Sequence, residues 1–382
     1  MSDAVELLRQ LVAIDTTSRR SNLELIEFVE EQLDRRGVTS TRVPNEEGHK
    51  ANLFAHLGPD VEGGVVLSGH TDCVPVDEQP WASDPFELRE EGGRLYGRGA
   101  ADMKGFLAVV LSKLDAFSEA ELTRPVFLAL SYDEELGTLG APSLVDAFVA
   151  QVPRPSAVII GEPTSLDIVD AHKGVRAFTT RVEGLDAHSS QPQGGANAVS
   201  AAARIAAFID DLAQEVASTD TDPRFEPPYT TFNVATIHGG QAINIIPRHA
   251  ELTWEYRPVP ADDSDELADR VRSYAEQAVL PLLRSTHPAA RIDFDRDAVV
   301  PTLGAEEGGE AVRLVRSLTG MTGPTRTVAF GTDGGHFQQA GLSTVVFGPG
   351  SIDQAHQPDE YIELAQLDRF GGFLDGLIDE LA

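Results

Sequence analysis

The chain is 382 residues long, 41% hydrophobic and 24% charged, with a formal net charge of −31. This length predicts two domains, or at most three, with a large buried core. The acidic excess argues against nucleic acid and against membrane surfaces as partners, because both are bound through positive charge. It fits a heavily solvated surface suited to a salty interior, or weak steering of cationic substrates.

Cys73 is the single cysteine, which excludes an internal disulfide and fits a reducing cytosol. The first residues, MSDAVELLRQ, lack the basic start and apolar stretch of a signal peptide. Apolar runs are also too short to span a membrane. We therefore expect a cytoplasmic protein.

Helices and short apolar runs alternate over the first 173 residues. Val5, Leu8, Leu11 and Val12 share one face of a first helix. A second helix is predicted from Ser21, with a capping box to Glu24, to Gly37, with Leu23, Ile26, Val29 and Leu33 facing inward. Strands are expected at 51–57, 65–69, 126–131 and 157–160, and further helices at 102–117 and 143–149. This alternation predicts a mostly parallel sheet covered on both faces.

The pattern changes near Gly174, where 175–184 alternates apolar and polar residues as a half-exposed antiparallel strand does. A helix at 197–216, strands at 230–237 and 249–259, a charged helix at 262–284 and a strand at 290–295 follow. That order predicts a ferredoxin-like α+β domain. From 297 the alternation of strands and helices returns, with a helix at 310–318, strands at 325–330 and 343–348, and a closing helix. We expect one domain built from 1–173 and 297–382, interrupted by an inserted domain at 174–296.

Acidic residues and histidines follow four of the apolar runs. They are His70, Asp72, Glu134, Glu135, Glu162 and His356. Since ligands bind at the carboxyl ends of parallel strands, these side chains should meet at one edge of the sheet. Carboxylates and imidazoles together suit zinc. The paired glutamates suggest one metal ligand and one general base.

Three residues near these motifs could either belong to the metal site or have a purely structural role. Asp72 could fix the tautomer of His70 by accepting its other ring N–H, although an isolated HxD motif is often structural. Asp102 either caps a helix or bridges two metal ions, with Gly97, Gly99 and Gly105 permitting close backbone approach. Cys73 should turn away from the metal site as a small packing residue.

The motifs GHTD, AADMKGF, DEE, GEPTS with AHKG, AHSS and GPGSIDQAHQPDE arrive in an order that resembles the M20 peptidase family of dinuclear zinc amidohydrolases. The resemblance covers essentially the whole chain and is greatest to the acetylornithine deacetylase branch. It implies a zinc-exopeptidase-like catalytic domain with an inserted lid and dimerisation domain. It also implies that N-acetyl-L-ornithine is hydrolysed to L-ornithine and acetate in arginine biosynthesis.

The resemblance further implies roles for individual residues. Two zinc ions, replaceable by Co²⁺, would share Asp102. One zinc would also bind His70 and Glu135, and the other Glu162 and His356. Glu134 would be the general base and then the acid, with Asp72 behind His70.

In the inserted domain, the resemblance implies that His188 crosses a homodimer interface and stabilises the oxyanion. Asn244 and Arg257 would hold the substrate carboxylate. The competing readings are a surface-loop histidine for His188 and an ordinary salt bridge for Arg257.

The loop GTDGGHF at 331–337 departs from the Thr-Glu-Ala loop expected in this branch. It leaves succinyl-diaminopimelate desuccinylase or a broader N-acyl-amino-acid deacylase as alternatives. One hypothesis is that Asp333 recognises the δ-ammonium of ornithine. A scaffold protein without catalytic activity would lack a ligand or the base, and none is missing.

Overall fold

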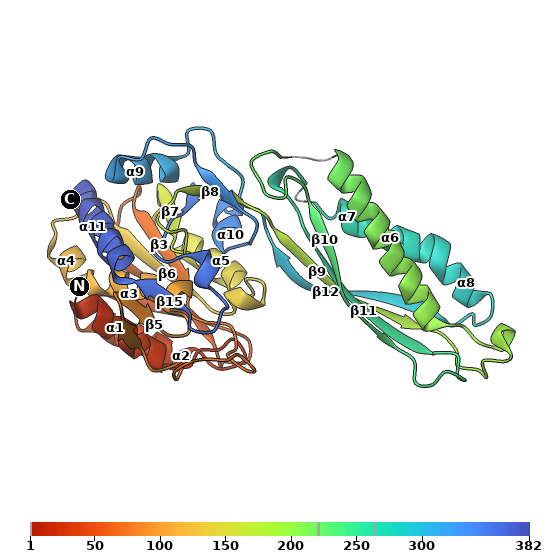
Figure 1. The fold of residues 1–382 in the computed structure, drawn as a ribbon. Helices are drawn as coiled ribbons and strands as arrows, with labels where there is room; N and C mark the ends of the chain where they lie inside the picture. Colours follow the sequence, from red (N-terminus) through yellow and green to blue (C-terminus); the bar gives the residue numbers. More distant parts are fainter. Residues whose placement is uncertain (1, 220–221, 263) are drawn as a thin grey trace. The chain divides into compact units, whose positions relative to one another are not determined.

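A computed structural model describes residues 2–219, 222–262 and 264–382, which form two compact units (Figure 1). Unit 1 contains the chain up to His172, Leu303–Thr327 and Gly331–Ala382. Unit 2 contains Lys173–Thr302 and Val328–Phe330. The chain returns to unit 1 at Leu303, and not at 297, because the last strand of unit 2 continues to Val300.

Unit 1 is built on an eight-stranded sheet with the order β1-β2-β6-β3-β7-β14-β8-β13. The strands are β1 (Ser40–Pro44), β2 (Ala51–Leu57), β3 (Val65–His70), β6 (Val126–Ser131), β7 (Ala157–Ile160), β8 (Val169–His172), β13 (Arg326–Val328) and β14 (Thr344–Val346). The four central strands β6, β3, β7 and β14 are parallel neighbours, while β1, β2 and β8 pair antiparallel. The predicted mostly parallel sheet is thus confirmed at its centre, where all four carboxyl ends point the same way.

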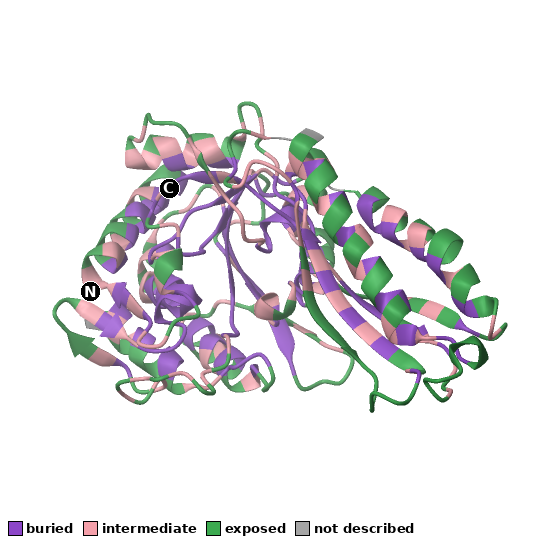
Figure 2. Cartoon of the chain, turned by 45° about the vertical axis from the view of Figure 1, so that its right-hand side comes forward, coloured by how far each residue is buried: buried purple, intermediate pink, exposed green. Residues whose placement is uncertain are grey.

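Helices bury both faces of this sheet, which explains its uninterrupted apolar strands (Figure 2). The helices of unit 1 are α1 (Ser2–Ala13), α2 (Leu23–Asp34), α3 (Gly105–Ser112), α4 (Leu114–Glu119), α5 (Ala141–Gln151), α9 (Glu310–Thr319), α10 (Gly334–Gln339) and α11 (Leu364–Leu381). On one face, Leu67 and Leu128 join a core shared with α1, α3 and α11. On the other, Phe127 meets Phe148 of α5 edge to face at 5.4 Å. No helix in the described ranges is long and apolar enough to cross a membrane.

Two predicted helices of unit 1 differ in detail. The helix expected from Ser21 begins at Leu23, and it buries Leu25 where Leu23 was expected. Its predicted stop is confirmed, since Gly37 has φ +69° just beyond the last turn. The helix expected at 102–117 is shorter and broken, because 100–104 form an irregular turn before α3. A small antiparallel sheet of β4 (Arg89–Glu91), β5 (Arg94–Tyr96) and β15 (Tyr361–Glu363) completes the unit.

Unit 2 has the predicted ferredoxin-like topology. Its elements are β9 (Val175–Glu183), α6 (Ala198–Thr219), β10 (Thr231–Gly239), β11 (His249–Arg257), α7 (Glu266–Tyr274), α8 (Leu280–Arg284) and β12 (Arg291–Val300). The antiparallel order is β10-β11-β9-β12, and burial alternates along β11 because the helices contact one face only (Figure 2). Residue 263, near the predicted start of the charged helix, lies outside the described residues.

Candidate metal centre

The carboxyl ends of the central strands of unit 1 carry the predicted ligands. His70 is the last residue of β3, and Glu162 follows β7 by two positions. Glu135 lies in the short turn Glu134–Leu136 after β6, and His356 lies in the loop after β14. Since β6, β3 and β7 are adjacent and parallel, their ends bring these side chains to one edge.

The side chains form two adjoining groups of ligand atoms. His70, Asp102 and Glu162 make one group, and Asp102, Glu135 and His356 make the other. Asp102 places Oδ1 at 2.9 Å from His70 Nε2 and Oδ2 at 3.5 Å from His356 Nε2. Asp102 is therefore shared between the groups, as a bridging carboxylate would be.

The expected division of the glutamates between the two groups is wrong. Glu135 was expected with His70, and Glu162 with His356. Instead, Glu162 Oε1 lies 3.8 Å from His70 Nε2, and Glu135 Oε2 lies 3.0 Å from His356 Nε2. Glu162 stays near its strand end beside β3, whereas the turn after β6 carries Glu135 away toward the His356 loop.

Asp102 is not the cap of α3, because α3 begins three residues later and Lys104 occupies the position before it. The predicted need for small residues holds at all three positions, since a Cβ on Gly97 would lie 2.8 Å from Val12 Cγ1. Gly99 has φ +76°, and a Cβ on Gly105 would lie 2.5 Å from the backbone oxygen of Ala100.

Asp72 binds the turn Glu134–Leu136 more closely than it binds His70. Its carboxylate accepts hydrogen bonds from Ser18 Oγ at 2.7 Å and from the backbone N–H groups of Glu134 and Glu135 at 3.1 and 3.3 Å. His70 Nδ1 lies 3.0 Å from the backbone oxygen of Asp72 and 3.5 Å from its carboxylate. The carbonyl of Asp72 is therefore the nearer acceptor that orients the imidazole, which corrects the expectation.

The buried acids of this cluster perturb one another. Burial and the charge of Glu162 raise the pKa of Glu134 well above its ordinary value, and burial and the charge of Asp102 raise that of Glu135 to about 7. Burial also raises the pKa of Glu162. Hydrogen bonds to Asp102 and Glu135 raise the pKa of His356 to about 10. So many enclosed carboxylates are stable in the charged form only beside cations, and a donor set of carboxylates and imidazoles fits divalent metal ions.

Asp333 is enclosed. It is 2% exposed, its Oδ2 accepts a hydrogen bond from Ser131 Oγ at 2.5 Å, and its Oδ1 is buried without a hydrogen-bond partner. Burial raises the pKa of Asp333 to about 6. This geometry does not favour the hypothesis that Asp333 meets a substrate ammonium group, because such contact needs an accessible oxygen.

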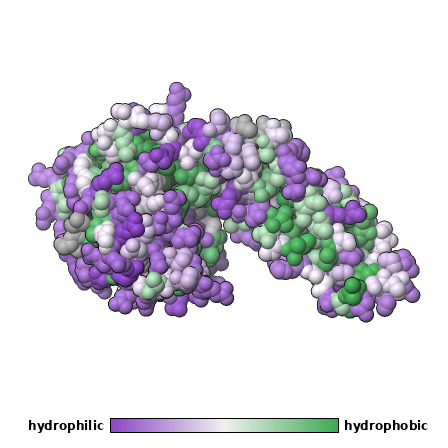
Figure 3. All heavy atoms as spheres, in the orientation of Figure 1, coloured by the Kyte–Doolittle hydropathy of each residue, from purple (hydrophilic) through white to green (hydrophobic). Residues whose placement is uncertain are grey.

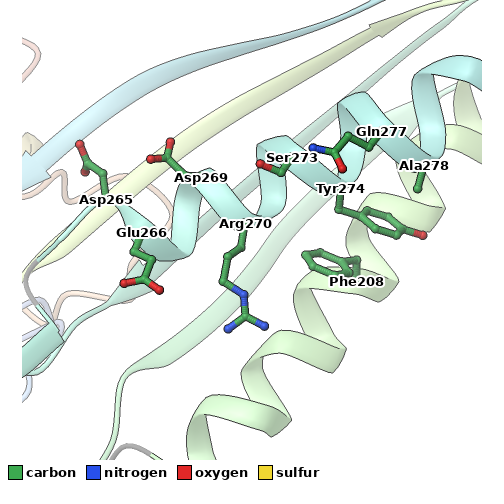
Figure 4. Close-up of a pocket in the computed structure, with 9 residues that line it drawn as sticks. All are labelled: Phe208, Asp265, Glu266, Asp269, Arg270, Ser273, Tyr274, Gln277 and Ala278. Carbon is green, nitrogen blue, oxygen red and sulfur yellow. The ribbon is translucent and has the colours of Figure 1, made fainter.

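The predicted residues of unit 2 are exposed or half-exposed. The segments of His188 and Asn244 lie side by side, since Ser189 N donates to the Asn244 oxygen at 3.0 Å. The imidazole Nδ1 of His188 lies 2.7 Å from Ser190 Oγ. Arg257 forms the competing salt bridge, with Nε 3.0 Å from Glu255. A separate surface pocket of unit 2, where Phe208 and Tyr274 stack between α6 and α7, contains none of the predicted residues (Figure 4).

Sequence reasoning missed a second set of buried polar residues in unit 1. Lys50 pairs with Asp133, the residue before Glu134, and Arg98 pairs with Glu360. Glu360 ends the HQPDE run, so its proximity to His356 in sequence was an available signal. Lys50 stands outside the motifs. Cys73 is buried as expected, and burial raises the pKa of its thiol to about 11.

A carboxylate shared by two donor groups at the carboxyl edge of a parallel sheet defines the class of metal-dependent hydrolases that use paired divalent ions. The chain belongs to Peptidase family M20/M25/M40, whose profile matches residues 66–380. Its cofactor is a divalent metal.

Two acetylornithine deacetylases are similar to this chain over nearly its full length. Acetylornithine deacetylase of Myxococcus xanthus is 36% identical over 380 residues, which cover 97% of this chain and 96% of that protein. Acetylornithine deacetylase of Proteus mirabilis is 35% identical over 384 residues, which cover 98% and 96%.

Solved structures share the fold at lower identity. A tripeptidase of Staphylococcus aureus has a TM-score of 0.75 at 18% identity, covering 100% of this chain and 98% of that one. A dinuclear metal-binding peptidase of the M20 family from Bacillus subtilis has a TM-score of 0.67 at 16% identity, with 100% and 98% covered.

Proposed function

We propose that this chain hydrolyses the amide bond of N-acetyl-L-ornithine to give L-ornithine and acetate, a reaction of arginine biosynthesis. The observation that carries the proposal is that Asp102 belongs to both groups of metal-ligand atoms. Glu134, the proposed base, directly precedes the ligand Glu135 in the sequence. The names and coverage of the relatives support this substrate.

We assign one zinc ion to His70, Asp102 and Glu162, and the other to Asp102, Glu135 and His356; Co²⁺ would substitute. When bound, zinc polarises the amide carbonyl and makes water more acidic. Glu134 takes the proton of the attacking water and returns it to the leaving amine. Burial raises the pKa of Glu134, which makes its carboxylate a stronger proton acceptor than an exposed glutamate.

In this proposal unit 1 is the catalytic domain, and unit 2 is a lid that also makes a homodimer. Exposed Ile237, Ile243 and Ile245 give unit 2 apolar surface. Figure 3 shows hydrophobic atoms exposed on the visible face of this unit. Strand β10 is an edge strand and leaves one side unpaired in the sheet. His188 would stabilise the oxyanion across the dimer, and Asn244 and Arg257 would bind the substrate carboxylate. Light scattering tests the dimer, and a fully active monomer would contradict it.

The loop at 331–337 departs from the sequence expected for an acetylornithine deacetylase, and this leaves two alternative substrates. They are N-succinyl-L,L-diaminopimelate and other N-acyl amino acids. Because Asp333 in this loop is enclosed, it provides no contact that would select ornithine. We place the enzyme in the cytoplasm.

The test is hydrolysis by zinc-loaded protein of N-acetyl-L-ornithine, N-succinyl-L,L-diaminopimelate and N-acetyl-L-methionine. We expect the first to have the highest kcat/KM. Glu134→Gln should lower kcat by about 10²- to 10⁴-fold while retaining metal. A higher kcat/KM for either other substrate would move the assignment to that substrate, and an active Glu134→Gln variant would remove the proposed base.

A further inference from the structure

The two histidine ligands are held in different ways. The side chain of His70 is 1% exposed, whereas that of His356 is 52% exposed. His356 also has φ +63°, which is uncommon for a residue other than glycine. Packing therefore contributes little to the position of His356. Its imidazole contacts Asp102 and Glu135, and contacts of its backbone add to these.

Gln79 supplies such a contact from a distant part of the sequence. Its Nε2 donates to the backbone oxygen of His356 at 2.9 Å. Its Oε1 accepts from Trp81 Nε1 at 3.0 Å and from Arg98 Nη2 at 2.5 Å. Both ends of the amide are thus used, which fixes its orientation.

Arg98 continues this network into the core. Its Nη1 lies 2.7 Å from Glu360 Oε2, and both side chains are 1% exposed. The guanidinium also lies 5.0 Å from the ring centroid of Trp81. A planar group with several fixed donors suits such a junction.

Glu360 connects the network to the shared ligand. Its Oε1 accepts the backbone N–H groups of Ala101 and Asp102 at 2.8 and 3.0 Å, and its Oε2 accepts that of Gly99 at 3.0 Å. A chain of hydrogen bonds thus runs from the backbone of Asp102 through Glu360, Arg98 and Gln79 to the backbone of His356. It fixes these two ligands relative to each other.

We propose that Gln79 is a positioning residue for the second metal, the one assigned to Asp102, Glu135 and His356. The proposal rests on the proposed function only through this assignment of ligands. The first metal should not depend on Gln79, because the remaining ligands of that metal, His70 and Glu162, stand at the ends of β3 and β7. Gln79 is the most selective residue to change, since Glu360 supports Asp102 and through it both metals.

The experiment is a calorimetric titration of metal-free protein with Zn²⁺, which needs no substrate. Gln79→Leu keeps the size of the side chain and removes both hydrogen-bonding groups. We expect one zinc to bind as in the unchanged protein and the other about 10- to 100-fold more weakly. His356→Ala identifies the second site, and Gln151→Leu, an exposed position at the end of α5, is the matched control and should bind both ions normally.

The proposal would be overturned if Gln79→Leu bound both zinc ions as tightly as the unchanged protein does, or if both ions bound more weakly by the same factor. An unchanged protein that binds a single zinc would overturn the dinuclear assignment and the proposal with it. If Gln79→Leu bound zinc normally and the unchanged protein hydrolysed acetylornithine, only the role of Gln79 would be refuted. The proposed function would stand.

Discussion

Asp72 accepts the backbone N–H of Glu134 at 3.1 Å, so the strand end that carries His70 also holds the proposed base. Its other oxygen accepts from Ser18 Oγ at 2.7 Å and from Glu135 N at 3.3 Å. The nearby imidazole and hydroxyl lower the pKa of Asp72 even though burial opposes this, so the side chain is a charged acceptor. One carboxylate thus sets the distance between a metal ligand and the base.

Asp72→Asn should lower kcat by about 10- to 100-fold, with a smaller change in KM. An amide has one acceptor oxygen, and its NH₂ group would face donors where Asp72 now accepts. Steady-state kinetics and zinc content measure the effect. Ser18→Ala removes a single donor and should cost less, and a wild-type kcat in Asp72→Asn would refute the positioning role.

Lys50→Met should lower the free energy of unfolding by about 3–5 kcal/mol, because it leaves Asp133 buried and unpaired. The two side chains are 6% and 10% exposed, and Lys50 also donates to the Ser18 oxygen. The double variant Lys50→Met/Asp133→Asn should lose less, since no buried charge remains. Urea unfolding measures both.

Lys113→Met is the matched control, since Lys113 pairs with Asp375 at the surface, where the partner is 57% exposed. Its expected cost is about 0–1 kcal/mol. Equal losses for Lys113→Met and Lys50→Met would contradict the burial argument.

Asp333→Asn should change kcat for N-acetyl-L-ornithine and N-acetyl-L-methionine by the same factor. The enclosed carboxylate contacts Ser131 at the end of β6, so its loss would disturb the site whatever the substrate. Measuring kcat and KM of Asp333→Asn with both substrates tests this prediction. A rise in KM confined to acetylornithine would restore the ammonium-binding hypothesis.

Much of the fold was predictable because it depends on local patterns. The apolar runs before His70 and Glu162 gave strands β3 and β7, and the change near Gly174 gave the ferredoxin-like order of unit 2. The irregular turn at Asp102 was not predicted, since its backbone N–H binds Glu360, which is 258 residues away in the sequence.

The division of ligands was mispredicted for a related reason. Sequence places both Glu135 and Glu162 just after strands, and only the turn after β6 carries Glu135 to His356. Lys50 and Gln79 escaped notice because their partners, Asp133 and the His356 backbone, lie far along the chain.

Metal-free protein should become less stable as the pH rises from about 5 to 9. Burial raises the pKa of Glu135 from 4.5 to about 7, so between these values the folded state holds a proton that the unfolded chain has released. Stability therefore falls with rising pH. Hydrogen bonds to Asp102 and Glu135 raise the pKa of His356 from 6.5 to about 10, so the decrease in stability continues to higher pH. The pKa values of Asp72 and Asp102 are lowered, so their contribution is lost only in acid.

Urea unfolding of chelator-treated protein at pH 5.5, 7 and 8.5 measures this trend. Zinc should reverse it, because metal ions compete with protons for the same side chains. A metal-free protein that gains stability over this range would show that the acids are not held protonated.

Salt should stabilise the fold. The net charge is −31, and the only lysines are Lys50, Lys104, Lys113 and Lys173, of which all but Lys113 are buried. Repulsion among surface carboxylates opposes folding, and the screening length falls from about 30 Å at 0.01 M salt to about 3 Å at 1 M. We expect Tm of zinc-loaded protein to rise with NaCl, most steeply at low concentration. A Tm that falls with NaCl would mean that the surface ion pairs of arginine, such as Arg181 with Glu251, outweigh this repulsion.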